Sequence, residues 1–151
     1  MDLQSKTFSY AGFWKRLAAF IVDSVIVSAG EFLSGFFLGI PYDVLTGRAE
    51  FVEHIPEYVL IIISNILFAW VYYAAMESSR KQATLGEMAL GIIVTDLSEN
   101  RISFGRASGR FFAGIISGFT LGIGFLMIGF TARKQGLHDM IAGCLVIDKN
   151  L

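Results

Sequence analysis

The sequence predicts an all-α protein that crosses a membrane several times and carries a small cytoplasmic β element. Hydrophobic residues make up 54% of the chain and charged residues 17%, whereas a soluble domain has about 25% charged residues. Three apolar stretches are long enough to form membrane helices, and a motif that follows the second of them recurs after the third. We therefore expect two repeated helical hairpins, the second short or re-entrant, in one domain of 151 residues.

The first apolar stretch runs from about Phe13 to Gly39 and contains the charged residues Arg16, Asp23 and Glu31. Its length suits a spanning helix, which needs about 20 residues. At about 100° per residue, the three charged side chains fall on one side of this helix. A polar stripe of this kind is expected to face the interior of a helix bundle, away from lipid.

Asp23 is the most unusual residue of this stripe. It would lie about 10 Å deeper in the membrane than Arg16, and an aspartate at mid-helix costs about 2.5–3.5 kcal/mol to insert. One interpretation is a structural clamp, in which Asp23 pairs with Arg16 or with Arg110. The other is a site for an ion or a proton, and the two roles are compatible.

The second apolar stretch runs from about Tyr58 to Met76 and has no charged residue. Trp70, Tyr72 and Tyr73 near its end are typical of the aromatic belt at a membrane surface. Asn65 in its middle is a candidate ligand in a cavity, although such polar residues also join helices by hydrogen bonds alone.

The third apolar stretch, from Phe111 to Phe130, has a Gly-Ile-Gly segment at 122–124. Glycine permits backbone angles that break a helix. We expect two short arms, 105–120 and 125–131, in a hairpin whose bend is tolerated in the membrane only when protein or water surrounds it. The competing interpretation is one straight helix that packs through its glycines.

A motif made of a basic triplet, a short turn with an acidic residue and a β-branched strand occurs twice. The first copy comprises 80–82, 85–88 and 92–96, and the second comprises 133–135, 137–140 and 144–148. We therefore divide the single domain, 1–151, into repeat A, about 9–104, and repeat B, about 103–148. The strands 92–96 and 144–148 are expected to pair, and 101–104 is expected to return as a further strand after a turn.

The acidic residues of the two copies, Glu87 and Asp139, occupy matching places. Capping of a short helix or pairing with the basic triplets is the plain explanation for both. His138, next to Asp139, is either a structural histidine at the membrane surface or a group that titrates near neutral pH.

Basic residues orient the chain through the positive-inside bias. Residues 1–16 carry three of them and the segment 77–110 carries five, whereas the loop 40–57 carries only Arg48 beside four acidic residues. The N-terminus, the middle segment and the C-terminal tail are therefore expected in the cytoplasm. Three straight spans would leave Arg133 and Lys134 outside, which favours the hairpin.

Several classes of protein are disfavoured. A single cysteine, Cys144, excludes an internal disulfide framework, and no Cys/His set has the spacing of a metal site. A net charge of −1 implies no affinity for nucleic acid. We recognise no nucleophile–base set and no motif for a cofactor, so we expect a protein that is not an enzyme and holds no cofactor.

Four segments in order resemble the RDD family of bacterial membrane proteins. They are FWKRLAAFIVD at 13–23, QATLG at 82–86, RISFGRA at 101–107 and LHDMIAG at 137–143. The resemblance implies a location in the bacterial inner (plasma) membrane and identifies Arg16, Asp23 and Asp139 as the arginine and two aspartates of the family name, with Glu87 as an acidic rival to Asp139. Transport, including cation/proton exchange, has been suggested for the family.

Two functions follow as expectations. The first is a small transporter that exchanges monovalent cations and protons through Asp23, with Glu31 on the route; a chain of this size would then work as a homo-oligomer. The alternative is a non-transporting scaffold or regulator of a partner membrane protein. The candidate residues are Arg16, Asp23, Glu31 and Asp139, followed by Arg110, His138, Glu87 and Asn65.

Overall fold

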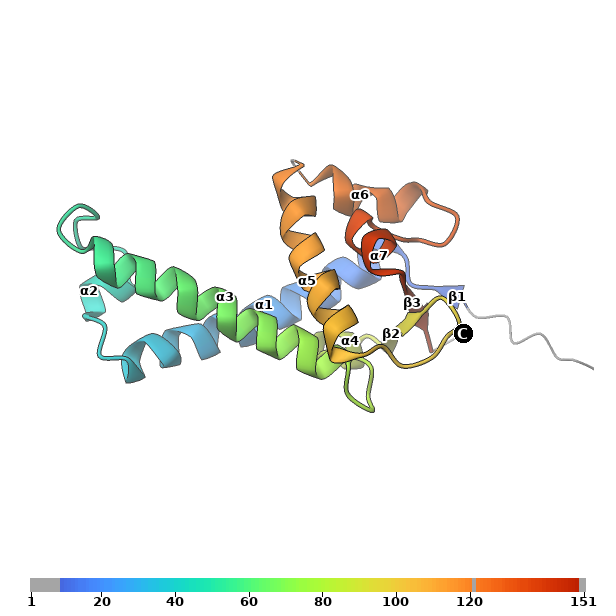
Figure 1. Ribbon diagram of the computed structural model, residues 1–151, viewed down its shortest axis with the longest axis horizontal. Helices are drawn as coiled ribbons and strands as arrows, with labels where there is room; N and C mark the ends of the chain where they lie inside the picture. The colour runs from blue at the N-terminus through green and yellow to red at the C-terminus, as the bar shows by residue number, and fades with distance from the viewer. Residues whose placement is uncertain (1–8, 121, 150–151) are drawn as a thin grey trace, which may run out of the picture. The chain divides into compact units, whose positions relative to one another are not determined.

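The computed structural model describes residues 9–120 and 122–149, which are mainly helical with one small antiparallel sheet (Figure 1). The expected fold class is therefore confirmed. The described residues belong to two compact units. The first unit draws on Met1–Asp23 and Tyr73–Leu151, and the second unit on Ser24–Tyr72. The division into repeats A and B is a different one, and it stays a prediction.

Two helices, α1 (Phe13–Phe37) and α3 (Ile55–Glu77), are long and apolar enough to cross a membrane. Their bounds agree with the first two predicted stretches. Large apolar side chains such as those of Ile62 and Ile63 on α3 are exposed. This exposure is the expected condition of a helix whose outer surface meets lipid, because lipid tails solvate such side chains.

Within the second unit, the helical segments 24–37 and 55–72 approach each other closely at Gly30. A Cβ atom added to Gly30 would lie only 2.3 Å from the Phe68 ring. The short helix α2 (Tyr42–Leu45) follows the end of α1, and its Val44 is buried. Leu45 covers Gly35 in the same way, since a Cβ atom there would lie 2.4 Å from a Leu45 methyl group.

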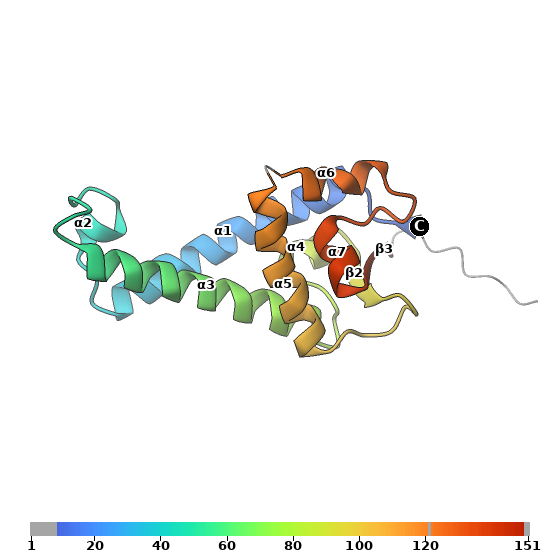
Figure 2. The same ribbon diagram turned by 45° about the horizontal axis from the view of Figure 1, so that its top comes forward.

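The third apolar stretch is broken into α5 (Phe104–Phe119) and α6 (Ile123–Phe130), which turn by 104° relative to each other (Figure 2). Gly122 lies at the break with a φ of 78°, in the left-handed region that glycine adopts readily. The interpretation as one straight helix is therefore wrong, and the predicted position of the break is confirmed. The bent pair is either a broken span or a re-entrant loop.

A three-stranded sheet has the order β1 (Ser9–Tyr10), β3 (Cys144–Asp148) and β2 (Ile92–Asp96), with both pairings antiparallel. The predicted pairing of the last two strands is confirmed, with Val94 opposite Val146. Every residue of β3 is buried.

The expected strand at 101–104 is wrong, because 101–103 are not in a strand and α5 begins at Phe104. The Ser103 hydroxyl accepts a hydrogen bond from the Arg106 backbone N–H at 3.2 Å and so caps that helix. The turn before it is held by the Asp96 carboxylate, which accepts from the Ser98 and Asn100 backbone N–H groups, both at 2.9 Å.

Each motif copy contains a short helix, α4 (Leu85–Ala89) in the first and α7 (Leu137–Ala142) in the second. The Thr84 backbone N–H donates to the Glu87 carboxylate at 2.9 Å, and the Gly136 backbone N–H donates to Asp139 at 2.8 Å. The capping role expected of both acidic residues is therefore present in both copies.

Candidate functional site

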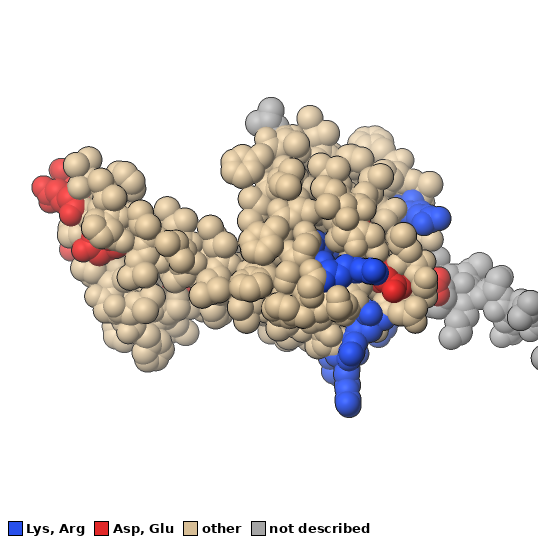
Figure 3. All heavy atoms as spheres, in the orientation of Figure 1, with Lys and Arg blue, Asp and Glu red and all other residues tan. Residues whose placement is uncertain are grey.

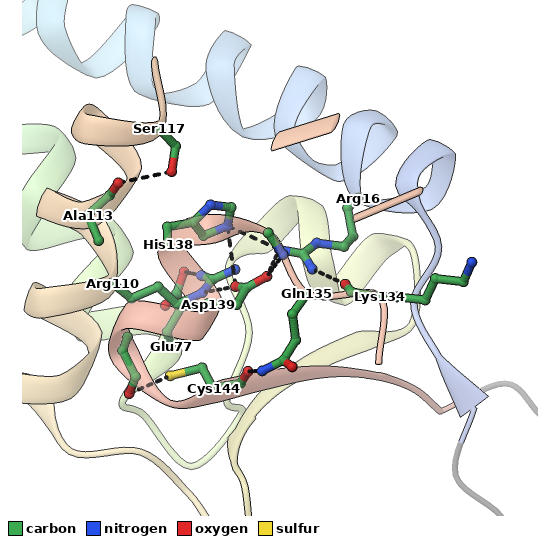
Figure 4. A network of polar contacts seen from close by, with 12 residues as sticks. Arg16, Glu77, Arg110, Ala113, Ser117, Lys134, Gln135, His138, Asp139 and Cys144 are labelled. Carbon is green, nitrogen blue, oxygen red and sulfur yellow. Dashed lines mark hydrogen bonds and ion pairs between the residues drawn. The ribbon is translucent and has the colours of Figure 1, made fainter. Parts of the chain in front are cut away.

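The Asp139 carboxylate lies at the centre of a buried ionic network in the first unit (Figure 4). Arg16 Nη2 is 2.6 Å from Asp139 Oδ2, and Arg110 Nε is 2.9 Å from Asp139 Oδ1. The Asp139 side chain is fully buried. A buried charge is stable only when it is paired and hydrogen-bonded, and both carboxylate oxygens meet this condition.

The two arginines join two further parts of the chain to this carboxylate. Arg16, in the first turn of α1, also donates to the Lys134 backbone carbonyl at 2.9 Å. Arg110, in α5, forms an ion pair with Glu77 at the end of α3. The guanidinium fork permits such contacts to several acceptors at once. The convergence of Arg16 and Arg110 on Asp139 was not predicted, because the sequence analysis offered both as partners for Asp23.

The network sets the charge state of Asp139. Burial opposes its ionisation, but the guanidinium of Arg16, followed by that of Arg110, holds the pKa of this carboxyl well below its usual range. Asp139 is therefore a fixed anion over the whole physiological pH range, and it holds α1, α5 and α7 together.

Glu77 is a site residue that the sequence analysis missed. It is 2% exposed, and it lies one residue beyond the charge-free stretch that we assigned to the second helix. An acidic residue at the first position after an apolar span, just before a basic triplet, was the available signal.

Asp23 holds a different contact in the first unit, between α1 and the start of α4. Its carboxylate accepts a hydrogen bond from the Thr84 hydroxyl at 2.6 Å and another from the Gly86 backbone N–H at 2.8 Å. Helix α4 approaches so closely that a Cβ atom on Gly86 would lie 2.2 Å from the Ala19 carbonyl oxygen. Asp23 therefore fixes the short helix that carries Glu87.

Glu87 is buried beside other carboxylates. Burial raises the pKa of Glu87 to about 8, and the nearby Glu77 carboxylate adds to this effect. The Arg110 guanidinium and the hydrogen bond from the Thr84 backbone act in the opposite direction. Glu87 therefore carries a proton at neutral pH and loses it at slightly alkaline pH.

His138 has one ring nitrogen in the network and one outside it. Nε2 lies 3.1 Å from Arg16 Nη2 and 3.2 Å from Asp139 Oδ1. Nδ1 is buried and has no hydrogen-bond partner among the described residues. Burial lowers the pKa of His138, so the ring is neutral at physiological pH.

Several of these groups help to line a cavity of about 620 Å³ in the first unit. Its charged and polar wall contains Arg16, Asp23, Glu77, Glu87, Arg110 and His138. Its apolar wall includes Phe13, Leu17, Phe111, Ile115, Phe125 and Leu126. A large apolar pocket with a few convergent polar groups is the usual form of a binding site.

The remaining predicted residues, Glu31 and Asn65, both lie in the second unit. They line a separate cavity of about 180 Å³ together with Ser28. The charged stripe predicted along α1 is thus divided, with Arg16 and Asp23 in the first unit and Glu31 in the second. Among the described residues, no group of His, Cys, Asp or Glu side chains is arranged to hold a metal ion.

A family model, the RDD family, matches residues 10–143. The chain belongs to the RDD family. One RDD-like relative, the Bacillus subtilis protein named "Uncharacterized protein YxaI", is 34% identical over 154 residues, which cover 92% of this chain and 97% of that protein. Another B. subtilis protein, named "Uncharacterized membrane protein YteJ", is 26% identical over 96% of this chain and 85% of its own length. No solved structure matches the chain.

Family membership and the two long apolar helices make this RDD chain a membrane protein. The arginine and two aspartates suggested by the resemblance, Arg16, Asp23 and Asp139, all lie in the first unit. Arg16 and Asp139 form its central ion pair, and Asp23 fixes the start of α4.

Proposed function

We propose that the protein exchanges a monovalent cation for a proton across the membrane and that Glu87 carries the proton. The observation that supports this function is a protonatable carboxyl, with a pKa of about 8, in the charged wall of a large cavity. A group whose pKa lies near the ambient pH exists in both charge states, as proton exchange requires.

The exchange follows from electrostatics within the cavity. When Glu87 loses its proton, the polar wall gains a negative charge and attracts a cation. When the proton returns, that attraction is lost and the cation is released. Because the coupling between two bound species is reciprocal, a bound cation must lower the proton affinity of Glu87 by the same factor.

The other acidic residues have supporting roles in this proposal. Sequence reasoning favours Asp23 as the exchanging residue, but two short hydrogen bonds bind its carboxylate to Thr84 and Gly86. Asp139 is held as an anion by two guanidiniums. Asp23 therefore positions Glu87, and Asp139 holds the surrounding helices.

Transport by purified protein in proteoliposomes tests the proposal, with Na⁺, K⁺, Li⁺ and an organic ammonium ion each imposed against a pH gradient. We expect flux that rises with pH around the pKa of Glu87. Glu87→Gln should abolish the proton coupling, because glutamine keeps the size of the side chain but cannot ionise. The control Glu53→Gln, at an exposed residue of the second unit, should behave as wild type. Absence of flux with every cation, or full proton-coupled flux in Glu87→Gln, would refute the proposal.

One observation favours the alternative, a scaffold or regulator of a partner membrane protein. The Arg16, Arg110 and Asp139 side chains are closely paired in the buried network, which is the expected condition of a purely structural clamp. If the wild-type protein transports no cation, this clamp is the better explanation of the network. Co-purification with a defined membrane partner would then be the informative measurement.

A further inference from the structure

We infer that the cavity of the first unit binds an amphipathic organic amine, whose ammonium group lies at the charged wall and whose hydrocarbon part lies along the apolar wall. The inference rests on the proposed function and names the class of its cation. Three features of the cavity support it: its lining, its net charge and the free nitrogen of His138.

The lining suits hydrocarbon better than a bare metal cation. At about 620 Å³ the cavity falls within the range of pockets that hold small organic molecules, about 300–1,000 Å³. Phe13, Phe111 and Phe125 contribute aromatic surface to it. The apolar lining residues offer no oxygen ligands to replace the hydration shell of a small cation. They do remove the hydrocarbon part of an amine from water.

The charge of the ionic network beside the cavity selects the headgroup. The charged side chains of the network and its neighbours are Arg16, Arg110, Asp23, Glu77 and Asp139. With neutral His138 and protonated Glu87, three carboxylates face two guanidiniums, so the cluster has an excess negative charge. Ionisation of Glu87 adds another. A cationic headgroup is therefore attracted, and an anionic headgroup such as a fatty-acid carboxylate is repelled.

His138 supplies a point of attachment. Its side chain is 7% exposed and lines the cavity. In the tautomer that donates its Nε2 proton to Asp139 at 3.2 Å, and does not accept from Arg16 Nη2 at 3.1 Å, the lone pair of Nδ1 is an acceptor. Nδ1 is the atom that has no partner among the described residues. An ammonium group has N–H donors to give and no acceptor, so it satisfies this nitrogen.

The test is isothermal titration calorimetry on the full chain in lipid nanodiscs with a matched series of probes. Phenylbutylammonium, phenylbutanol and phenylbutyrate share one hydrocarbon part and differ in charge, and NaCl at equal ionic strength provides the small cation. We expect the ammonium compound to bind at least tenfold more tightly than the alcohol and the carboxylate, with little competition from Na⁺.

The pH dependence identifies the site. Arg16 and Asp23 of α1, Glu77 of α3, Arg110 of α5 and His138 of α7 line the same polar wall as Glu87. A primary amine stays charged up to about pH 10. Its affinity should therefore rise by roughly tenfold between about pH 7 and pH 9, as Glu87 ionises.

Three variants separate the contributions. Glu87→Gln should remove the rise with pH while keeping the affinity measured at neutral pH, because glutamine resembles the protonated side chain. Leu17→Ala should weaken binding of phenylbutylammonium by roughly tenfold through lost apolar contact, and Glu53→Gln should change nothing.

The outcomes of these measurements distinguish an organic amine from the other possible ligands of the cavity. Equal binding of the alcohol and the amine would mean an apolar groove for lipid chains, and preferential binding of phenylbutyrate would mean an anionic lipid; either result overturns the inference. Binding of Na⁺ alone would also overturn it, yet leave cation/proton exchange intact. Amine binding without flux in proteoliposomes would retain the amine site and refute the proposed exchange.

Discussion

Glu87 and Asp139 occupy matching places in the two motif copies but have opposite acid–base properties. Each caps a short helix through a backbone N–H group. Burial opposes the charged form of both acids. At Asp139 two guanidiniums outweigh burial, whereas at Glu87 the Glu77 carboxylate adds to it. Guanidiniums thus make one acid a fixed anion, whereas burial gives the other a pKa of about 8.

Replacement of Asp139 by alanine is expected to destabilise the protein strongly. Arg16 and Arg110 would lose their shared carboxylate, and breaking a buried pair from one side costs on the order of 3–5 kcal/mol. Thermal unfolding in detergent measures the loss, with Asp43→Ala at an exposed position of α2 as the control. Similar melting temperatures for the two variants would contradict the central role of Asp139.

Stability is expected to fall as the pH rises from about 4.3 to about 8, and Glu87 is the cause. Its pKa of about 8 in the folded protein is above the unfolded value of about 4.3. The folded state therefore binds the extra proton between these values, so stability decreases as pH rises through this window and levels off above it.

The variant Glu87→Gln tests this prediction, because it removes the titrating group and keeps its size. It should melt at the same temperature as wild type at low pH and at a higher temperature near pH 9. His138, whose pKa is lowered, acts in the opposite direction below about pH 6.5, and it does so equally in both proteins. A parallel pH dependence in both proteins would show that another group is responsible.

Sequence reasoning identified most residues of the site but not their partners. The depth of Asp23 and the place of Asp139 in a repeated motif were visible as unusual positions of charge. Spacing along a chain, however, does not say which helices meet, so the assignment of Arg16 and Arg110 to Asp139 required the fold. Asp23 was expected to need a charged partner, and a hydroxyl and a backbone N–H from α4 bind its carboxylate.

At the scale of helices and strands, residues that start or break a helix predicted the structure better than short apolar patterns typical of strands did. The glycines at 122–124 predicted the break between α5 and α6, because glycine adopts the left-handed backbone angles that end a helix. Gly122 has such an angle, with a φ of 78°. The segment 101–104 looked like a strand after a turn, but Ser103 caps a helix instead. Serine before a helical segment was a start signal that outweighed the short apolar pattern.

Gly122→Ala tests whether the break depends on glycine. A residue with a side chain at a φ of 78° is strained, at a cost of about 1–2 kcal/mol. Gly118→Ala is the matched control, because it lies within α5 and a Cβ atom there meets nothing within 4 Å. We expect Gly122→Ala to melt at a lower temperature than wild type and Gly118→Ala to melt at the same temperature or a higher one. The reverse order would mean that the chain does not require the left-handed angle.

At the scale of the whole molecule, the two units differ in the sign of the charged side chains that they expose (Figure 3). Acidic side chains gather in the second unit near α2. The loop 40–57 contains Asp43, Glu50, Glu53 and Glu57. Lysine and arginine side chains gather on the first unit, which contains both basic triplets. Loops rich in lysine and arginine are retained in the cytoplasm. This distribution therefore favours an orientation in which the basic segments of the first unit face the cytoplasm and the loop 40–57 faces the opposite side.

The bent pair α5–α6 makes this orientation possible, since a hairpin returns the chain to the side from which it entered. We therefore predict that the segments around Lys81 and Lys134 face the cytoplasm and that Arg48 faces the opposite side. Single cysteines at these three positions, in a chain with Cys144→Ala, can be labelled in oriented vesicles with a reagent that does not cross the membrane. Positions 81 and 134 should react from the cytoplasmic side and position 48 from the other. Labelling of position 134 from the same side as position 48 would mean that α5 and α6 together form one broken span, and the C-terminal tail would then lie outside.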